Sequence, residues 1–309
     1  MPGRDAKMAH GDRGVSRPRK WLETPAAPIV SGSPKWSEMR VAKQIYMAPW
    51  WGEQVLAEGR RGLWQIGPLD LWLERAAGEL RLLTVVSRDV QDTTSRVRIP
   101  ARRRLPDPAT ADEQLRFVGA DWEGVEVEPA LADRAVVSRP GTPLHVPPDG
   151  RATLYVSSPL WVRIRRARGG CLLHERPVHR LSDTWVGDST REGELAYASR
   201  TNGRLDWRDL TVNRHRAVTP VHIDNRGDDP LVLERISLPI PRLGLYLGEA
   251  TAPLWTQSIC LERREKSGLA DVRLEHGSPE EAGSAATELA VPRQGGERHF
   301  AARAFSALF

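Results

Sequence analysis

Two cysteines and the absence of any long apolar run limit what this chain of 309 residues can be. Cys171 and Cys260 are too few and too far apart for a disulfide scaffold or for a zinc site built from cysteine pairs, so we expect free thiols. No stretch approaches the ~18 consecutive apolar residues of a membrane-spanning helix, and the first residues lack the apolar segment of a signal peptide. The sequence therefore predicts a cytoplasmic protein with no membrane span.

Phenylalanine and tyrosine are scarce, with four of each, whereas tryptophan occurs eleven times. An indole ring buries a large apolar area and carries one N–H that needs a partner. Trp64 and Trp72 lie within strand-like patterns, so we expect them to pack in the core. The pair Trp50-Trp51 could line a ligand groove, but packing between sheets is the interpretation that we favour.

The positive charge is concentrated at the amino-terminal end. The net charge is +5, and residues 1–40 hold eight basic and four acidic residues, which leaves +1 for the other 269. A nearly neutral body gives little reason to expect nucleic-acid binding. Residues 1–46 are rich in Pro, Gly, Ser and Arg without any period, so we expect a disordered basic tail. Met47 could be the true start of the protein, and a genuine flexible arm is the alternative.

Short strands separated by glycine and proline dominate beyond this tail. Leu69–Arg75 and Glu79–Val86 flank a short turn that contains glycine, which predicts a β-hairpin. Residues 217–224 and 231–239 lie on either side of a polar loop, and they predict a second hairpin of the kind that is common in β-sandwiches.

Together these patterns predict an all-β protein, an antiparallel β-sandwich with two sandwich-like lobes at residues 47–168 and 169–309. Residues 101–134 are polar and weakly patterned, so we expect an excursion over the surface. The end of the chain differs, because apolar residues in 298–309 recur at helical spacing. We expect a short C-terminal helix there, and a C-terminal strand is the alternative.

The best metal-binding pattern is Cys171-x2-His174-x4-His179, because thiolate and imidazole are zinc ligands. The spacing fits no common zinc motif, and on a strand Cys171 and His174 would face opposite sides. A buried cysteine with two surface histidines is the alternative, and it is the interpretation that we favour.

A cluster of arginines is the best candidate for ligand binding. Arg163 and Arg165 share one face of a predicted strand that also holds Trp161, and Arg166 follows them. Two guanidinium groups on one face could hold a phosphate or a carboxylate. The alternative is a solvated charged face that protects an exposed strand edge.

Motifs for catalysis are missing from the sequence. It contains no Gly-x-Ser-x-Gly elbow and no phosphate-binding loop between a strand and a helix. The paired carboxylates Asp228-Asp229 and Glu280-Glu281 fall in predicted loops, where solvated acids are ordinary. We therefore expect no cofactor and no catalytic residues.

The order of several segments resembles the family called domain of unknown function 432, over about residues 50–262. The resemblance implies an intracellular, β-rich protein of archaea or bacteria with no established activity. It also implies an association with small-conductance mechanosensitive channels, near which members are encoded. The segments that carry it are Trp51-Gly52, Gly59, Ile66-Gly67-Pro68-Leu69 with Trp72 and Arg75, Ser158-Pro159-Leu160-Trp161-Val162, Gly193-Glu194-Leu195-Ala196-Tyr197, Thr201-Asn202-Gly203 and Ile223-Asp224-Asn225.

Three functional hypotheses follow. The first, which we favour, is a non-enzymatic binding or accessory protein with an apolar groove rimmed by arginine. The second is an enzyme acting on a carbohydrate or a small anion, which needs acids or histidines that converge in a pocket. The third is nucleic-acid binding through the basic amino-terminal arm.

Overall fold

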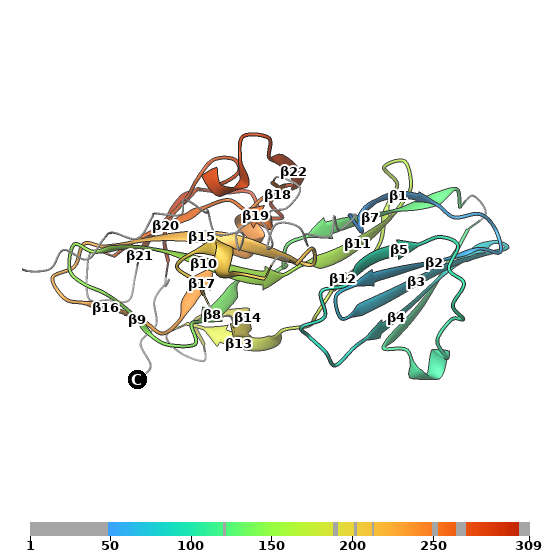
Figure 1. Cartoon of the computed structure of the whole chain (residues 1–309), viewed down its shortest axis with the longest axis horizontal. Helices are drawn as coiled ribbons and strands as arrows, with labels where there is room; N and C mark the ends of the chain where they lie inside the picture. Colours follow the sequence, from blue (N-terminus) through green and yellow to red (C-terminus); the bar gives the residue numbers. More distant parts are fainter. Residues whose placement is uncertain are drawn as a thin grey trace, which may run out of the picture. The chain divides into compact units, whose positions relative to one another are not determined.

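β-Strands make up nearly all of the regular structure, as the sequence predicts (Figure 1). The chain divides into two units, Met1–Gln44 and Ile45–Phe309. The computed structural model describes only residues of the second unit, namely 49–119, 122–187, 191–200, 203–211, 213–248, 253–263 and 270–302. The expected basic tail and the candidate start Met47 lie outside the described residues.

The helices of the described residues are all single 3-10 turns. No helix there is long and apolar enough to cross a membrane. The four turns are η1 (Pro108–Thr110), η2 (Trp207–Asp209), η3 (Ile240–Arg242) and η4 (Glu280–Ala282).

The first sheet, sheet I, confirms the first predicted hairpin. β3 (Leu69–Ala76) and β4 (Glu79–Val86) pair antiparallel along their whole length, and Gly78 in the turn has φ +70°. Trp64 and Trp72 are buried, as expected, on opposite faces of this sheet. Sheet I has the order β5-β2-β3-β4-β6, formed by Ser95–Arg98, Arg61–Ile66, Leu69–Ala76, Glu79–Val86 and Glu113–Val118.

The expected surface excursion over residues 101–134 is wrong, because this segment contains β6 and β7 (Gly124–Ala130). β7 lies inside sheet II, where Val125 and Val127 are buried. The acidic residues that suggested a solvated segment alternate with these valines, and one of them, Glu128, pairs with Arg165. Sheet II has the order β1-β7-β11-β12, formed by Gly52–Val55, Gly124–Ala130, Trp161–Arg166 and Leu172–Pro177.

Sheet III is the largest and mixes antiparallel with parallel pairs. Its central strand β15 (Arg216–Asn225) pairs antiparallel with β10 (Arg151–Pro159). It pairs parallel with both β19 (Leu254–Thr256) and β20 (Ile259–Arg263). Figure 1 shows β10 and β15 running side by side. The rest of the sheet follows the order β22-β18-β19-β15-β20-β21-β23, in which the remaining strands are Thr287–Ala290, Leu245–Leu247, Leu254–Thr256, Ile259–Arg263, Ala270–Leu274 and His299–Ala302.

β15 contains Pro220, although a proline cannot donate to a sheet ladder. Opposite it, Tyr155 exchanges both backbone hydrogen bonds with Arg204 rather than with β15. The backbone of Pro220 therefore faces the other side of the strand. On that side β19 has ended and β20 has not yet begun, so no N–H is required there.

The second predicted hairpin is wrong. β15 does not pair with the segment that follows its loop, because β10, β19 and β20 already occupy both of its edges. The returning segment is split in two. β16 (Leu231–Leu233) pairs with β9 (Leu144–Val146), and β17 (Ile236–Leu238) pairs with β8 (Val136–Arg139).

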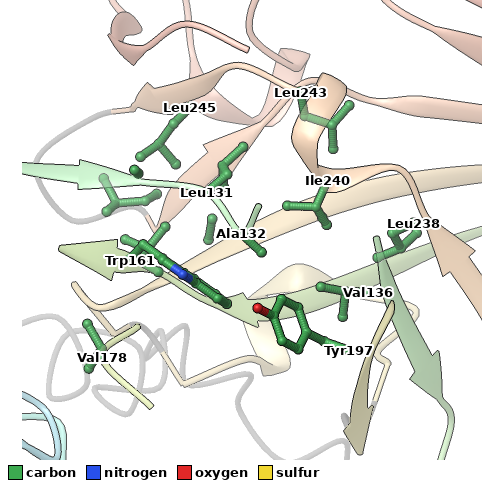
Figure 2. Close-up of a cluster of buried hydrophobic side chains, with 14 of the residues drawn as sticks. Leu131, Ala132, Val136, Trp161, Val178, Tyr197, Leu238, Ile240, Leu243 and Leu245 are labelled. Atoms are coloured by element: carbon green, nitrogen blue, oxygen red, sulfur yellow. The ribbon is translucent and has the colours of Figure 1, made fainter. Parts of the chain in front are cut away.

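β8 and β17 belong to a four-stranded sheet IV with the order β13-β14-β8-β17. β13 (Ser182–Val186) and β14 (Glu194–Arg200) form an antiparallel hairpin, and β14 pairs parallel with β8. The core of the protein includes residues from sheets I to IV. Figure 2 shows the part of it where Trp161 lies beside Tyr197, with 5.4 Å between the ring centroids.

Two expectations concern the ends of the proposed lobes. The boundary at residues 168 and 169 falls in the turn between β11 and β12, which pair with each other, and the division into two lobes stays a prediction. The C-terminal helix is wrong for His299–Ala302, which form β23 and so follow the strand alternative. Residues 303–309 lie outside the described part of the chain.

Candidate functional site

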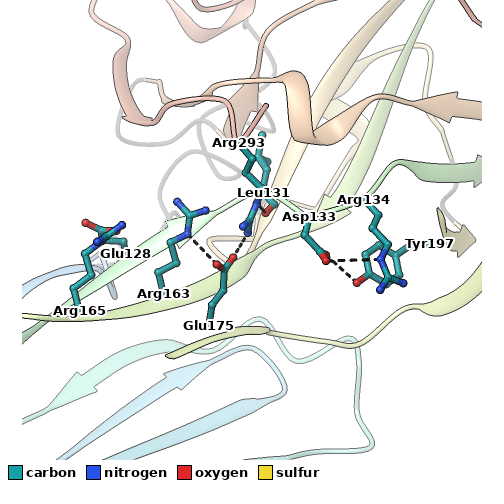
Figure 3. Close-up of polar contacts among 9 residues, drawn as sticks. All are labelled: Glu128, Leu131, Asp133, Arg134, Arg163, Arg165, Glu175, Tyr197 and Arg293. Carbon is teal, nitrogen blue, oxygen red and sulfur yellow. Dashed lines mark hydrogen bonds and ion pairs between the residues drawn. The ribbon is translucent and has the colours of Figure 1, made fainter. Parts of the chain in front are cut away.

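Two of the arginines predicted to bind a ligand, Arg163 and Arg165, pair with acids on neighbouring strands (Figure 3). Arg163 Nε lies 3.2 Å from Glu175 Oε2, and Arg165 Nε lies 3.0 Å from Glu128 Oε2. Trp161 is 4% exposed and belongs to the core. These contacts form a charged strand face, but β11 pairs with β7 and β12 on its two sides, so the face does not protect an exposed strand edge. None of these arginines lines the two cavities described below.

Arg166 and Glu175 each have a further contact. The guanidinium of Arg166 lies over the ring of Trp122, 5.7 Å from its centroid. Glu175 also accepts from Arg293, whose Nε donates to the carbonyl of Leu131 at 2.7 Å. Figure 3 shows Glu175 between the two arginines that it binds. The carboxylate thereby connects β12 to the segment that follows β22.

The candidate metal ligands lie in separate environments. Cys171 is exposed, rather than buried as the favoured interpretation had it. His174 Nε2 lies 3.0 Å from Glu113 Oε2, the same oxygen that Arg176 binds. In the described part of the chain, no group of three His, Cys, Asp or Glu side chains could hold a metal ion.

His179 belongs to a different cluster, next to the start of β15. Burial and the charge of Arg216 lower the pKa of His179. His215 is 3% exposed, and burial, with a smaller contribution from Arg216, lowers its pKa to about 4. Both imidazoles therefore favour the neutral form more than a free histidine does.

A shallow trough of about 350 Å³ on sheet III collects polar side chains that the sequence did not single out. Thr153, His222, Cys260 and Arg273 lie on β10, β15, β20 and β21, each opposite the next. Thr153 Oγ1 lies 3.1 Å from His222 Nδ1. Cys260 Sγ donates to Glu275 Oε1 at 3.2 Å. Burial raises the pKa of this thiol, and the thiol is therefore protonated at neutral pH.

A larger groove of about 660 Å³ lies beside sheet IV. One side is formed by neighbouring strands of that sheet, from the end of β13 and the start of β14 to β17. The other side is formed by η3, β21, β23 and Gln294. The apolar residues of the lining are Ala135, Val186, Leu195, Ala196, Pro239, Pro241, Val272 and Phe300.

Two arginines lie in the lining of this groove. Arg134 is paired, because its Nη1 lies 3.2 Å from Asp183 Oδ1 and its guanidinium lies over the ring of Tyr197. Asp133, next to it, accepts from the Tyr197 hydroxyl at 2.9 Å (Figure 3). Arg242 stacks on Phe300, with its guanidinium carbon 4.4 Å from the ring centroid.

The apolar surface continues beyond the groove onto the β13–β14 hairpin. Leu195, which lines the groove, is 45% exposed, and its cross-strand partner Trp185 is 46% exposed. Exposed apolar side chains that stand alone are ordinary, whereas a continuous patch beside a cavity is typical of an interaction surface.

The family described as protein of unknown function (DUF432) has a model that matches residues 50–309. The chain belongs to this family. No curated protein and no solved structure matched the chain.

Residues by which the DUF432 family was anticipated have structural roles. Gly67 turns sheet I with φ +55°, and a Cβ there would lie 2.6 Å from Cε1 of His215. Asn225, fully buried at the end of β15, donates to three backbone carbonyls. Leu195 is different, because it lies in the groove. Gly67 and Asn225 are therefore explained by packing and hydrogen bonding within the fold, and they give no evidence about activity.

Sequence reasoning missed the groove and the trough. His222 and Cys260 are brought together only because β15 and β20 pair in parallel, a pairing that no local pattern announces. The ion pair of Arg163 could have been found. The predicted turn at residues 168–170 starts a hairpin, and pairing its strands outward from that turn brings Glu175 opposite Arg163.

The two thiols of this DUF432 protein are expected to differ in reactivity. A thiolate is the reacting form, so the raised pKa and partial burial of Cys260 should slow its reaction with a disulfide reagent at pH 8, by about tenfold relative to Cys171. Labelling of Cys171→Ser and Cys260→Ser variants measures each thiol separately. Glu275→Gln should accelerate labelling of Cys260, because the Glu275 carboxylate accepts a hydrogen bond from the thiol and its charge disfavours the thiolate. Equal rates for the two thiols would contradict this assignment.

Proposed function

We propose that this protein is a non-enzymatic binding or accessory protein whose partner docks in the groove beside sheet IV. The observation that carries the proposal is the combination of apolar side chains, two arginines and a partly exposed Trp185–Leu195 pair in and beside one groove whose lining also holds acids. Tryptophan and arginine are enriched among the residues that dominate binding energy at protein interfaces. A groove of this chemistry is what the binding hypothesis requires.

The finer form of the proposal concerns the partner. The family resemblance suggests a small-conductance mechanosensitive channel, and a cytoplasmic location would follow for a protein that meets such a channel from inside the cell. The groove itself supports only the docking of a partner, and its chemistry is not specific to a channel.

The alternative of an enzyme rests on histidines and acids that converge in a cavity. The histidines of the described part lie in different places: His174 pairs with Glu113, His222 faces the trough, and His179 and His215 lie near Arg216. The trough is the place to test that alternative, since it joins an imidazole and a thiol. Nucleic-acid binding through the basic arm concerns residues outside the described part, and deletion of residues 1–46 tests it.

Co-purification from the host tests the proposed function. Leu195→Asp places a charge in the groove, so the retained amount of the specific partner should fall at least about tenfold, because an unpaired carboxylate would be buried at the contact. The matched control is Val118→Asp, at an 85% exposed valine on an edge strand of sheet I.

Mass spectrometry of the three samples identifies the partner, and blotting for the channel tests the finer form. A protein retained equally by the native chain and both variants does not bind the groove, and that result would remove the proposal. Loss with both variants would point to misfolding, which a thermal melt of each variant separates from loss of binding.

A further inference from the structure

We infer that the groove recognises a polypeptide segment in which an acidic side chain stands among apolar residues, and that Arg242 binds its carboxylate. This inference rests on the proposed function and names the chemistry of the partner at that same site. It is carried by three observations: the state of Arg242, the rigidity of its position, and the extent of the apolar surface around it.

Arg242 differs from the other arginines of this region in having no acid beside it. Arg134, Arg163 and Arg165 each have a carboxylate within 3.2 Å. Within the described residues, Arg242 has no ion pair, and its guanidinium stacks on Phe300. A guanidinium stacked on a ring keeps its N–H groups at the edge of the plane, where a carboxylate can bind two of them.

The position of Arg242 is fixed before any partner arrives. It ends the turn η3, where its backbone N–H donates to the carbonyl of Pro239 at 2.9 Å. Pro239 and Pro241 restrict the backbone on its amino-terminal side, and the backbone N–H of Gln294 binds the carbonyl of Pro241 at 2.9 Å. A fixed arginine loses little conformational freedom on binding, which favours its use in recognition.

Four acids lie in or near the groove, and none of them forms an ion pair with Arg242. Glu192 and Glu194 belong to the lining, just before and at the start of β14. Asp133 accepts from Tyr197, and Asp183 binds Arg134. A carboxylate of the partner could therefore bind Arg242 without displacing an existing ion pair. The ring of Phe300 covers one face of the Arg242 guanidinium, so water screens such a pair less than it screens a fully exposed ion pair.

A polypeptide fits the surface better than a small molecule does. The apolar surface does not end at the cavity but continues from Phe300 and Leu195 to Trp185 on the edge strand β13. A small organic acid would fill the cavity and leave Trp185 exposed. A chain segment can place its carboxylate on Arg242 and cover the hairpin with its apolar side chains.

Selection from a random peptide library displayed on phage, with the full chain as bait, tests the inference. The native chain should enrich peptides in which Asp or Glu stands beside aliphatic or aromatic residues. For a selected peptide, Arg242→Gln should weaken binding at least about tenfold, the usual effect of losing a charge-assisted contact. Arg242→Lys should restore part of the loss, since it returns the charge but not the planar fork.

Two controls assign the effect to the groove. Arg208→Gln removes an arginine outside the groove that also stacks on an aromatic ring, with its guanidinium carbon 5.2 Å from the ring centroid of Trp207. This variant should leave peptide binding unchanged. Leu195→Asp should abolish binding of the same peptides. If the peptides bound Leu195→Asp and the native chain with equal affinity, their binding site would lie outside the groove. This result would overturn the inference.

The remaining outcomes separate the inference from the proposed function. Apolar peptides without acid enrichment, or an acid preference that persists in Arg242→Gln, would overturn the role of Arg242 and leave partner docking intact. Failure to enrich any peptide would overturn a polypeptide segment as the occupant, while the co-purification result decides the function independently. If the native chain formed a dimer and Leu195→Asp did not, the occupant of the groove would be a second copy of the chain. If the chain captured peptides only after deletion of residues 1–46, the occupant would be its own amino-terminal residues.

Discussion

Alanine in place of Asn225 is expected to lower the free energy of unfolding by about 3 kcal/mol, because several buried polar groups lose their partner together. The Nδ2 group donates to the carbonyls of Val146, Pro147 and Asp229 at 2.9–3.0 Å. These carbonyls come from the end of β9 and from the loop after β15, and Asn225 itself is 0% exposed. A single amide therefore joins two segments that are far apart in the sequence.

The other end of the same amide is engaged as well. Oδ1 accepts from the backbone N–H of Gly227 and from Arg263 Nη1, both at 3.3 Å. Arg263 is only 8% exposed, so its lost contact cannot be replaced readily by water. For a chain of this size, a loss of 3 kcal/mol corresponds to a fall in Tm of roughly 5 °C.

Urea denaturation of variants at this site and at a neighbouring site measures the effect. Asn225→Asp nearly preserves the volume but cannot donate to the three carbonyls, so a similar loss is expected from it. The matched control, Asp228→Ala in the same loop, replaces an exposed side chain and should stay within about 0.5 kcal/mol of the native value. A native-like Asn225→Asp would show that volume rather than hydrogen bonding matters at this position.

Asn225 also shows where local patterns stop being informative. The loop after it has the composition of a hairpin turn, and residues on both sides alternate, so the sequence predicts that the two sides pair. The buried amide instead binds this loop to the end of β9, and β16 pairs there. Composition reveals that the chain turns, but the choice of pairing partner depends on which edges of β15 are already occupied.

Where a strand pairs with the next one along the chain, the sequence was sufficient. β3 and β4 are joined by Ala77-Gly78, and their alternation puts Trp72 opposite Leu83 as the hairpin requires. β10 and β15 are paired over nine positions and contact each other more than 50 residues apart, and neither carries a signal for the other. The all-β class therefore followed from local pattern, whereas the parallel pairs of sheets III and IV did not.

The groove could not be predicted for the same reason. Arg242, Phe300 and Leu195 come from η3, β23 and β14, and none of them stands out within its own segment of the sequence. Arg163 and Arg165 attracted attention because they stand close together in the sequence. Clustered basic residues on a strand often form ion pairs with acids on the neighbouring strands. Arg242, in contrast, is isolated from other basic residues in the sequence and forms no ion pair among the described residues.

Acidification from pH 6.5 to pH 4 is expected to remove about 3 kcal/mol of stability through His215 alone. Burial lowers the pKa of His215 from 6.5 to about 4; Arg216 and His179 act in the same direction, and Asp92 opposes them. Between these two pH values the unfolded chain binds a proton at this residue and the folded chain does not. Its contribution is therefore fully present above pH 6.5 and is lost as the pH falls to 4.

The surroundings of His215 make it costly for the imidazole to reach solvent by a local rearrangement. Its ring lies against the turn at Gly67, which leaves no space for a side chain there, and its carbonyl accepts from the backbone N–H of Leu160 at 2.9 Å. Exposing the imidazole to water would separate this turn of sheet I from the start of β15. Protonation is thus expected to be coupled to unfolding of the larger structure rather than to a side-chain rotation.

The urea midpoint as a function of pH, compared between the native chain and His215→Gln, isolates this residue. Carboxylates that titrate at low pH contribute to both proteins, so the difference between the two curves reports His215. The difference should change by about 3 kcal/mol between pH 6.5 and pH 4 and should be constant above pH 7, where the imidazole is neutral in both states. His145→Gln, at an exposed histidine outside the cluster, serves as the control. If the stability of the native chain and of His215→Gln changed with pH in the same way, the folded protein would bind the proton at His215 without loss of stability. The packing of the imidazole against Gly67 would then have to loosen near pH 6.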